Sequence, residues 1–235
     1  MLLVGGFIFG TLLGSFINSI SERLITQRPI LTVRSICSQC GKPISWRDLI
    51  PVLNYFLLKG RCRECGAKIP AVFPVTELAM GFLSATVIGL FSFSLHGILW
   101  IGFFGCLLVT VQTDYRSGFV YNEALYPLLS FALALTFVEA DIVLRFARAI
   151  MWLGMILVLA WGVKKVLQKE AMGEGDYYVI FALALVAQYQ EMLEVILGAS
   201  LLGIIVAWKW KQVSLPFIPL LGTAFSLVFF LRVFA

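Results

Sequence analysis

Two aspartates, Asp114 and Asp176, stand at boundaries between long apolar stretches and short polar ones. Ionisable side chains at membrane depth are energetically expensive, so they usually face a cavity and mark a functional site. Asp176 follows directly on Gly173-Glu174-Gly175, whose glycines allow another segment to approach the carboxylate closely. An aspartate that only caps the next helix would leave the same pattern, so this loop alone fits both roles.

A pair of carboxylates at one depth is what acid–base hydrolysis of a peptide bond requires. Two nearby carboxylates resist ionising together, so one keeps its proton while the other is charged. The charged one can deprotonate an attacking water, and the neutral one can polarise the scissile carbonyl. The competing interpretation is an ion- or metal-handling membrane transporter in which Asp114 and Asp176 bind the cargo, a role that intramembrane acids also serve.

Four of the five cysteines form two Cys-x2-Cys pairs, Cys37 with Cys40 and Cys62 with Cys65, and a glycine follows each pair. Four thiolates in this spacing are typical of a structural, tetrahedral zinc site. Disulfides are the alternative in an oxidising compartment, whereas cytosolic thiols stay reduced. A zinc ion with four cysteine ligands has no open position for water, so we expect a structural metal rather than a catalytic one.

The composition places these residues in a membrane protein. Hydrophobic residues make up 60% of the chain, charged residues only 13%, and the mean hydropathy is +0.95. A bilayer core needs about 20 apolar residues per helix. We predict an all-α, multi-pass membrane protein with about eight transmembrane helices, at residues 2–20, 72–95, 98–113, 124–138, a fifth ending near 163, and then 177–187, 193–208 and 215–234. The sixth and seventh are short, as expected of helices that stop around a cavity.

Between the first two helices, residues 21–71 are polar and carry nine basic side chains against three acidic ones. A segment this long must fold on its own, yet it is too small to bury a sufficient core, so the metal would supply much of its stability. Basic loops remain in the cytoplasm, where zinc is favoured over disulfides. We therefore predict three parts: helix 1–20, a cytoplasmic zinc-binding domain at 21–71, and a seven-helix membrane domain at 72–235.

The distribution of positive charge predicts the orientation. If the first helix is retained with its start outside, alternation places residues 21–71, 114–123, 164–176 and 209–214 inside, and they hold fifteen of the eighteen Lys and Arg residues. Both termini are then extracytoplasmic, and Asp114 and Asp176 lie on the cytoplasmic side. The net charge of +5 reflects this orientation and the contact with membrane lipid, since nothing in the chain is typical of a nucleic-acid-binding module.

Several motifs together resemble a type IV prepilin peptidase over essentially the whole chain. They are Gly14-Ser15-Phe16-x-Asn18 with Arg23-Leu24, the two cysteine pairs, Asp114 before a helix, and Met172 followed by Gly173-x-Gly175-Asp176. One feature differs: the family usually follows its first aspartate with an Ile-Pro-Asp type triplet, where this chain has Val120-Tyr121-Asn122. The difference alters a turn and removes no catalytic group.

The resemblance implies a GxGD-type aspartic endopeptidase of the bacterial inner membrane. Asp114 and Asp176 would cleave the basic leader of prepilins and pseudopilins at the cytoplasmic membrane face, with Gly173, Glu174 and Gly175 as the active-site loop. Many members of the family also methylate the new amino terminus with S-adenosylmethionine. For that activity the chain offers only two candidates, Asn18 and Glu77, which are either methyltransferase residues or structural polar residues.

Helix direction suggests how the two aspartates share their roles. Asp176 precedes a helix, whose N-terminal dipole favours a carboxylate, whereas Asp114 lies at the C-terminal end of one, where a negative charge is disfavoured. We therefore expect Asp176 to be the ionised base and Asp114 the protonated acid. A scaffold protein of a secretion assembly is a further alternative, and it predicts that neither aspartate is needed for substrate processing.

Overall fold

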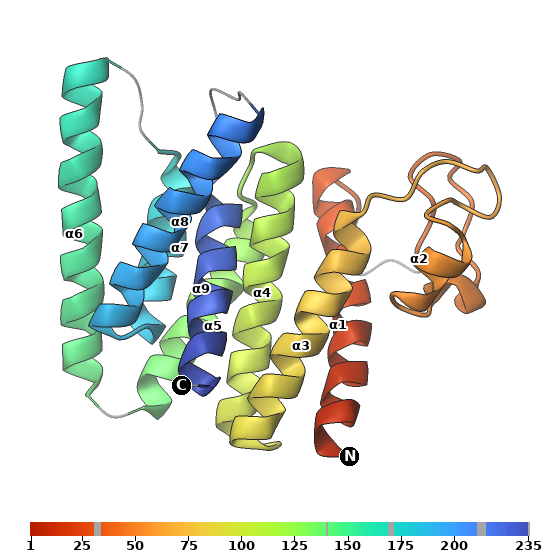
Figure 1. The fold of residues 1–235 in the computed structure, drawn as a ribbon, viewed down its shortest axis with the longest axis horizontal. Helices are drawn as coiled ribbons and strands as arrows, with labels where there is room; N and C mark the ends of the chain where they lie inside the picture. The colour runs from red at the N-terminus through yellow and green to blue at the C-terminus, as the bar shows by residue number, and fades with distance from the viewer. Residues whose placement is uncertain (31–33, 140, 169–171, 211–214, 235) are drawn as a thin grey trace. The chain divides into compact units, whose positions relative to one another are not determined.

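The computed structural model describes residues 1–30, 34–139, 141–168, 172–210 and 215–234. Within these residues the chain is helical apart from loops and two isolated β-bridges, as Figure 1 shows. The elements are α1 (Leu2–Ile25), η1 (Trp46–Leu49), α2 (Leu53–Leu57), α3 (Val72–Phe91), α4 (Leu95–Ser117), α5 (Asn122–Val138), α6 (Ile142–Leu167), α7 (Glu174–Val186), α8 (Tyr189–Trp210) and α9 (Phe217–Phe234). The predicted all-α class is confirmed.

Each of the eight predicted membrane helices has a counterpart, but the helices differ in length. Within the described residues, five are long and apolar enough to cross a membrane, namely α1, α3, α4, α6 and α8, while α5 and α9 are shorter apolar helices. The chain is therefore a multi-pass membrane protein.

The expectation of a short helix at 193–208 was wrong, because α8 has 22 residues and starts at Tyr189. The polar stretch before residue 193 is the helix start: the Glu191 carboxylate accepts the backbone N–H of Gln188 at 2.7 Å, which caps the first turn.

The chain forms two compact units, residues Met1–Thr113 and Asp114–Ala235. In the first unit α1 packs along α3 through a stripe of small residues at every fourth position, Gly6, Gly10 and Gly14. A Cβ added at Gly14 would lie 2.6 Å from the Cα of Glu77, and one at Gly10 would meet the carbonyl oxygen of Met80. Small residues of this kind let two helix backbones approach closely in lipid.

We expect Gly14→Ala to lower the free energy of unfolding by about 1–3 kcal/mol, because the added methyl group forces α1 and α3 apart. Gly5→Ala on the same helix is the matched control, since a Cβ at Gly5 meets nothing within 4 Å. Chemical unfolding of both variants in mixed micelles measures the difference. Equal stability of the two variants would show that the close approach of α1 and α3 is unimportant.

The second unit is built around α7, a helix of 13 residues. Every residue from Ala182 to Val186 is buried, as are Val179 and Ile180, and α5, α6 and α9 pack against this helix. A helix that is apolar on all sides belongs in the interior of a bundle. α7 is about 20 Å long, whereas the hydrocarbon core of a bilayer is about 30 Å thick. The helix is therefore too short to cross the core.

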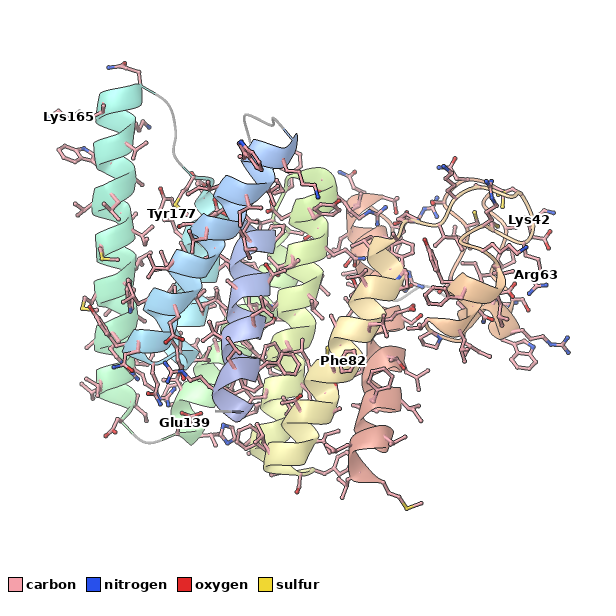
Figure 2. The ribbon with its side chains drawn as sticks, viewed as in Figure 1. Lys42, Arg63, Phe82, Glu139, Lys165 and Tyr177 are labelled. Atoms are coloured by element: carbon pink, nitrogen blue, oxygen red, sulfur yellow. The ribbon has the colours of Figure 1, made fainter. Side chains whose placement is uncertain are left out.

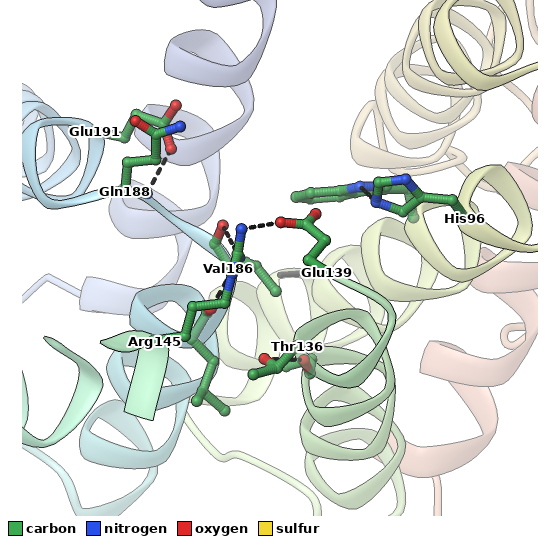
Figure 3. A network of polar contacts seen from close by, with 10 residues as sticks. His96, Thr136, Glu139, Arg145, Val186, Gln188 and Glu191 are labelled. Carbon is green, nitrogen blue, oxygen red and sulfur yellow. Dashed lines mark hydrogen bonds and ion pairs between the residues drawn. The ribbon is translucent and has the colours of Figure 1, made fainter. Parts of the chain in front are cut away.

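The C-terminal end of α7 is held by Arg145 from α6. Its guanidinium donates to the backbone carbonyls of Leu185 and Val186, both at 3.4 Å, and it forms an ion pair with Glu139 just after α5 (Figure 3). An arginine in this position satisfies carbonyls that have no partner within the helix, and its charge opposes the negative end of the helix dipole. Arg145 therefore ties α5, α6 and α7 together at one end.

Candidate functional site

Asp176 is the third residue of α7, not the residue before it as the sequence suggested. Its side chain is 9% exposed, and its Oδ2 accepts the backbone N–H of Gly173 at 2.9 Å. The backbone N–H of Asp176 in turn donates to the carbonyl of Gly173 at 3.2 Å. The loop thus folds back on the first turn of α7, and this local capping arrangement fixes the direction of the carboxylate.

Asp114 lies in the last turn of α4 and is 7% exposed. The backbone N–H of Ile218, the second residue of α9, hydrogen-bonds to its carboxylate. Within the described part of the chain, the Oδ2 of Asp114 is buried and has no hydrogen-bond partner. The free amides at a helix N-terminus attract anions, so α9 supplies Asp114 with a positive electrostatic environment that its own helix does not.

The two aspartates lie in the same unit and are close enough for the charge of Asp114 to act on Asp176. Each carboxylate is placed at the N-terminal end of a helix, α7 for Asp176 and α9 for Asp114. The roles expected from sequence took into account only the dipole of the helix that carries each aspartate, and not that of α9. Because α9 also contributes, helix dipoles alone do not decide which aspartate is charged.

The glycine loop before Asp176 packs against Val120, the first residue of the Val120-Tyr121-Asn122 triplet. A Cβ added at Gly175 would lie 2.5 Å from Cγ2 and 2.8 Å from Cβ of Val120, whereas one at Gly173 would meet only the Oδ2 of Asp176, at 3.7 Å. Glu174 is the exposed first residue of α7. The second glycine is thus required by close packing against Val120, while the first is not.

The four paired cysteines come together in the first unit. The sulfur atoms of Cys37, Cys40, Cys62 and Cys65 all lie within 4.8 Å of one another, and the Sγ atoms of Cys37 and Cys65 are 3.9 Å apart. A disulfide would require about 2.05 Å, whereas four sulfurs around one zinc at about 2.3 Å are separated by about 3.8 Å. The arrangement therefore matches a tetrahedral metal site and not a pair of disulfides.

Residues 34–71, here called the cysteine module, contain the same loop twice. In each, the first cysteine donates its N–H to the carbonyl five residues on and accepts the N–H of the glycine four residues on, at 2.8–2.9 Å. The glycines, Gly41 and Gly66, have φ of +70° and +71°, which explains why glycine follows each pair. The bridges Ile36–Pro43 and Arg61–Lys68 close the two loops.

Two surface ion pairs join the halves of the module. Lys42 contacts Glu64 at 2.9 Å, and the guanidinium of Arg63 contacts Asp48 at 2.7 Å; Figure 2 labels the two basic residues. The hydrogen bond from Arg63 holds the pKa of Asp48 below its ordinary value, and the bond to Glu64 raises the pKa of Lys42. Both acidic side chains of the module are therefore paired with a basic one.

Asn18 and Glu77 lie next to each other in a buried polar network. The amide nitrogen of Asn18 donates to Glu77 at 3.4 Å and to the Phe73 carbonyl at 3.1 Å, while its oxygen accepts from Gln112 at 2.8 Å. The second oxygen of Glu77 accepts the backbone N–H of Val52 at 2.7 Å. The network joins α1, the cysteine module, α3 and α4. These polar side chains therefore have a structural role, which is to hold the four parts together.

A cavity of about 490 Å³ opens beside this network, between the cysteine module and the ends of α1 and α3. Asn18 and Glu77 line it, together with Tyr55, Glu22 and Arg23. Its size falls in the range of small-molecule sites, and its wall combines four carboxylates with six basic side chains and two aromatic rings. Sequence reasoning missed Gln112 and Val52 because neither belongs to a motif, although a glutamine inside an apolar helix is a general indication of a buried polar contact.

Comparison with known proteins identifies the family. A family model described as "Bacterial Peptidase A24 N-terminal domain" matches residues 8–91, which include Asn18, the four cysteines and Glu77. A second model, "Type IV leader peptidase family", matches residues 101–208, which include both aspartates. No solved structure matches the chain.

Curated relatives agree with these models. A prepilin leader peptidase/N-methyltransferase of Myxococcus xanthus is 28% identical, and the alignment covers 85% of this chain but only 60% of that protein. Proteins of the same name from Burkholderia pseudomallei (strain 1026b) and Klebsiella pneumoniae are 31% and 30% identical. Both alignments cover 83% of this chain, and they cover 67% and 90% of those proteins, respectively. The chain therefore belongs to the type IV prepilin leader peptidase (peptidase A24) family.

Proposed function

We propose that this protein is a membrane-embedded aspartic endopeptidase that removes the basic leader of type IV prepilins or pseudopilins, with Asp114 and Asp176 as its catalytic residues. The observation that carries the proposal is the juxtaposition of these two buried carboxylates in one unit. Family membership supplies the substrate class. The relatives named above are prepilin leader peptidases, and the second family model spans both aspartates.

The proposed reaction needs one proton shared between the two carboxylates. The charged one takes a proton from water as the water oxygen attacks the scissile carbonyl, and the neutral one donates a hydrogen bond to the carbonyl oxygen. Collapse of the tetrahedral intermediate breaks the carbon–nitrogen bond, and the nitrogen leaves with a proton from the pair. Since α7 and α9 each favour a charge at one aspartate, helix dipoles do not assign the shared proton to either of them.

We further propose that cleavage occurs on the cytoplasmic side of the bacterial inner membrane, with the cysteine module on the same side and both termini outside. The distribution of basic residues supports this orientation. A prepilin leader is basic and would enter from the side where it is synthesised. The polar turn of Gly173 and Glu174 would then meet the substrate near that surface.

For the metal, we propose a single structural zinc ion held by Cys37, Cys40, Cys62 and Cys65. The sulfur separations fit zinc, and four thiolate ligands suit this metal better than calcium or magnesium, which prefer oxygen. This zinc would hold the module together and take no part in hydrolysis.

For methylation, we propose that the cavity beside Asn18 and Glu77 holds S-adenosylmethionine. The names of the relatives include N-methyltransferase, and the carboxylates of Glu22 and Glu77 and the ring of Tyr55 in the cavity wall are groups that a cationic donor with an adenine group can contact. When bound, the donor supplies the methyl group that moves from its sulfur to the new terminal amine. Glu77 can accept the proton that the amine loses, and Asn18 holds Glu77 in place.

The test uses the purified protein in lipid nanodiscs and a prepilin fragment that includes the basic leader and the apolar segment after it. Intact-mass measurement should show two products, and addition of S-adenosylmethionine should add one methyl group to the mature one. Donor binding is measured separately by calorimetry, where Glu77→Gln should weaken it. If neither prepilins nor pseudopilins are cut while vesicles containing the protein conduct an ion, the transporter interpretation replaces this one.

We expect Gly175→Ala to lower the cleavage rate by about 100-fold, because an added methyl group meets the stiff, β-branched Val120 and displaces the turn that carries Asp176. Val120→Gly removes the clash, so the double variant should recover much of the activity. Gly173→Ala is the control in the same loop, with room for a methyl group at ordinary contact distance. A Gly173→Ala variant as inactive as Gly175→Ala would contradict this packing argument.

A further inference from the structure

The short helix α2 of the cysteine module has its apolar side facing outward. Leu53, Phe56 and Leu57, at positions i, i+3 and i+4, are 61%, 67% and 73% exposed, whereas the polar Asn54 between them is 7% exposed. Asn54 is held inside by a hydrogen bond to the carbonyl of Arg47. This pattern is the reverse of that on a helix at a water-facing surface, where the apolar stripe turns inward.

The neighbouring η1 contacts α2 and also exposes apolar side chains. Trp46 is 70% exposed, and Ile50 and Leu49 are also exposed. We call Trp46, Leu49, Ile50, Leu53, Phe56 and Leu57 the α2 patch. Single exposed apolar residues need no explanation, but a contiguous group of them marks a surface that contacts something other than water.

The α2 patch lies at a fixed level along a candidate membrane span. Val52, directly before α2, donates its N–H to Glu77 at 2.7 Å, and Glu77 is the sixth residue of α3. α3 has 20 residues, or about 30 Å, which matches the thickness of a hydrocarbon core. A residue bonded to the second turn of such a helix lies close to the boundary between headgroups and acyl chains, and Leu53 of the patch is the very next residue.

The charge of the module fits the same location. Residues 34–71 contain seven basic and two acidic side chains, and both acidic ones are paired with Arg63 and Lys42. Arg47 stacks on the patch itself, with its guanidinium 5.3 Å from the centre of the Trp46 ring. Tryptophan and arginine side by side suit the headgroup region, where the ring is amphipathic and the cation meets lipid phosphates.

We propose that the α2 patch is a membrane-docking surface that inserts Trp46, Phe56 and Leu57 into the interface of a bilayer rich in anionic phospholipid. The cysteine module then lies on the membrane beside α1 and α3 rather than projecting into water. Two ends tethered to helices and one inserted face hold the module in a single orientation. This inference does not depend on the proposed peptidase or methyltransferase activity.

The first experiment locates Trp46 by fluorescence of the full-length protein in nanodiscs containing phosphatidylglycerol. The contribution of Trp46 is the difference between the wild type and Trp46→Phe. Lipids brominated near the headgroup end of their acyl chains should quench this contribution, and aqueous acrylamide should not. Trp161, which is 64% exposed on the candidate span α6, serves as the positive control for lipid contact through Trp161→Phe. Quenching of Trp46 by acrylamide but not by brominated lipid would overturn the proposal.

The second experiment measures hydrogen exchange of residues 46–57 and uses a variant with Leu53→Ser, Phe56→Ser and Leu57→Ser. Because these side chains are exposed, the variant should retain its metal, while exchange in this segment should rise at least about threefold. Replacing phosphatidylglycerol by phosphatidylcholine should also raise hydrogen exchange in residues 46–57 of the wild type. If the wild-type segment exchanges as fast as the variant in anionic nanodiscs that hold only this protein, the patch does not bind lipid and must serve a protein partner instead.

Discussion

Asp114→Asn and Asp176→Asn should each lower kcat for prepilin cleavage by about 1,000-fold or more. An asparagine can neither accept the proton of the attacking water nor donate one to the leaving nitrogen, and a positioned acid–base group contributes about 10²–10⁴-fold. Because the two carboxylates act as a unit, the double variant should be no slower than either single one. Single-turnover cleavage of a prepilin fragment by protein in nanodiscs measures both effects.

A matched control is available in Asp141, which is exposed and stands directly before α6 with φ of +66°. Asparagine tolerates this left-handed conformation well, so Asp141→Asn should cleave at the wild-type rate. All three variants should unfold at similar temperatures and retain their metal. Wild-type cleavage by either Asp114→Asn or Asp176→Asn would refute the catalytic pair.

Cys62→Ser should abolish zinc binding and unfold the cysteine module. Structural zinc sites of four cysteines bind with about 10–16 kcal/mol, and a segment as small as residues 34–71 cannot replace this from its own core. We expect about one zinc per wild-type chain and none in the variant, and rapid proteolysis within the module only in the variant or after strong chelation. Elemental analysis and limited proteolysis measure these outcomes.

The fifth cysteine gives the control for this prediction. Cys106 lies in α4 outside the metal cluster, so Cys106→Ser should leave the zinc content unchanged. Cleavage should be less affected by Cys62→Ser than by the aspartate substitutions, because both aspartates belong to residues 114–235. Stoichiometric zinc in Cys62→Ser would mean that the four cysteines are not the metal site.

The cluster of four cysteines could be predicted from sequence because its determinants are local. Each Cys-x2-Cys-Gly loop is closed by hydrogen bonds over four or five residues, so the spacing fixes half of the site before any tertiary contact is made. Likewise, the glycine loop before Asp176 is a short-range feature. These elements have few conformations that satisfy their backbone groups.

What could not be predicted depends on packing between segments far apart in the sequence. The contact of Ile218 with Asp114 changes the electrostatic argument for that aspartate, yet the two residues have no common motif. The pairing of Gly175 with Val120 is of the same kind. The outward direction of the apolar side of α2 could not be predicted either, because periodicity shows that a helix has an apolar side but not which way that side faces.

The Arg145 contact at the C-terminal end of α7 has a consequence for the depth at which Asp176 is held. The 13 residues of α7 set a distance of about 20 Å between the turn that carries Asp176 and this contact. The C-terminal end of α7 is fixed by the polar contacts of Arg145 and Glu139, which Figure 3 shows. If Asp176 acts as proposed, the scissile bond of a substrate has to reach the depth at which this length of helix holds the carboxylate.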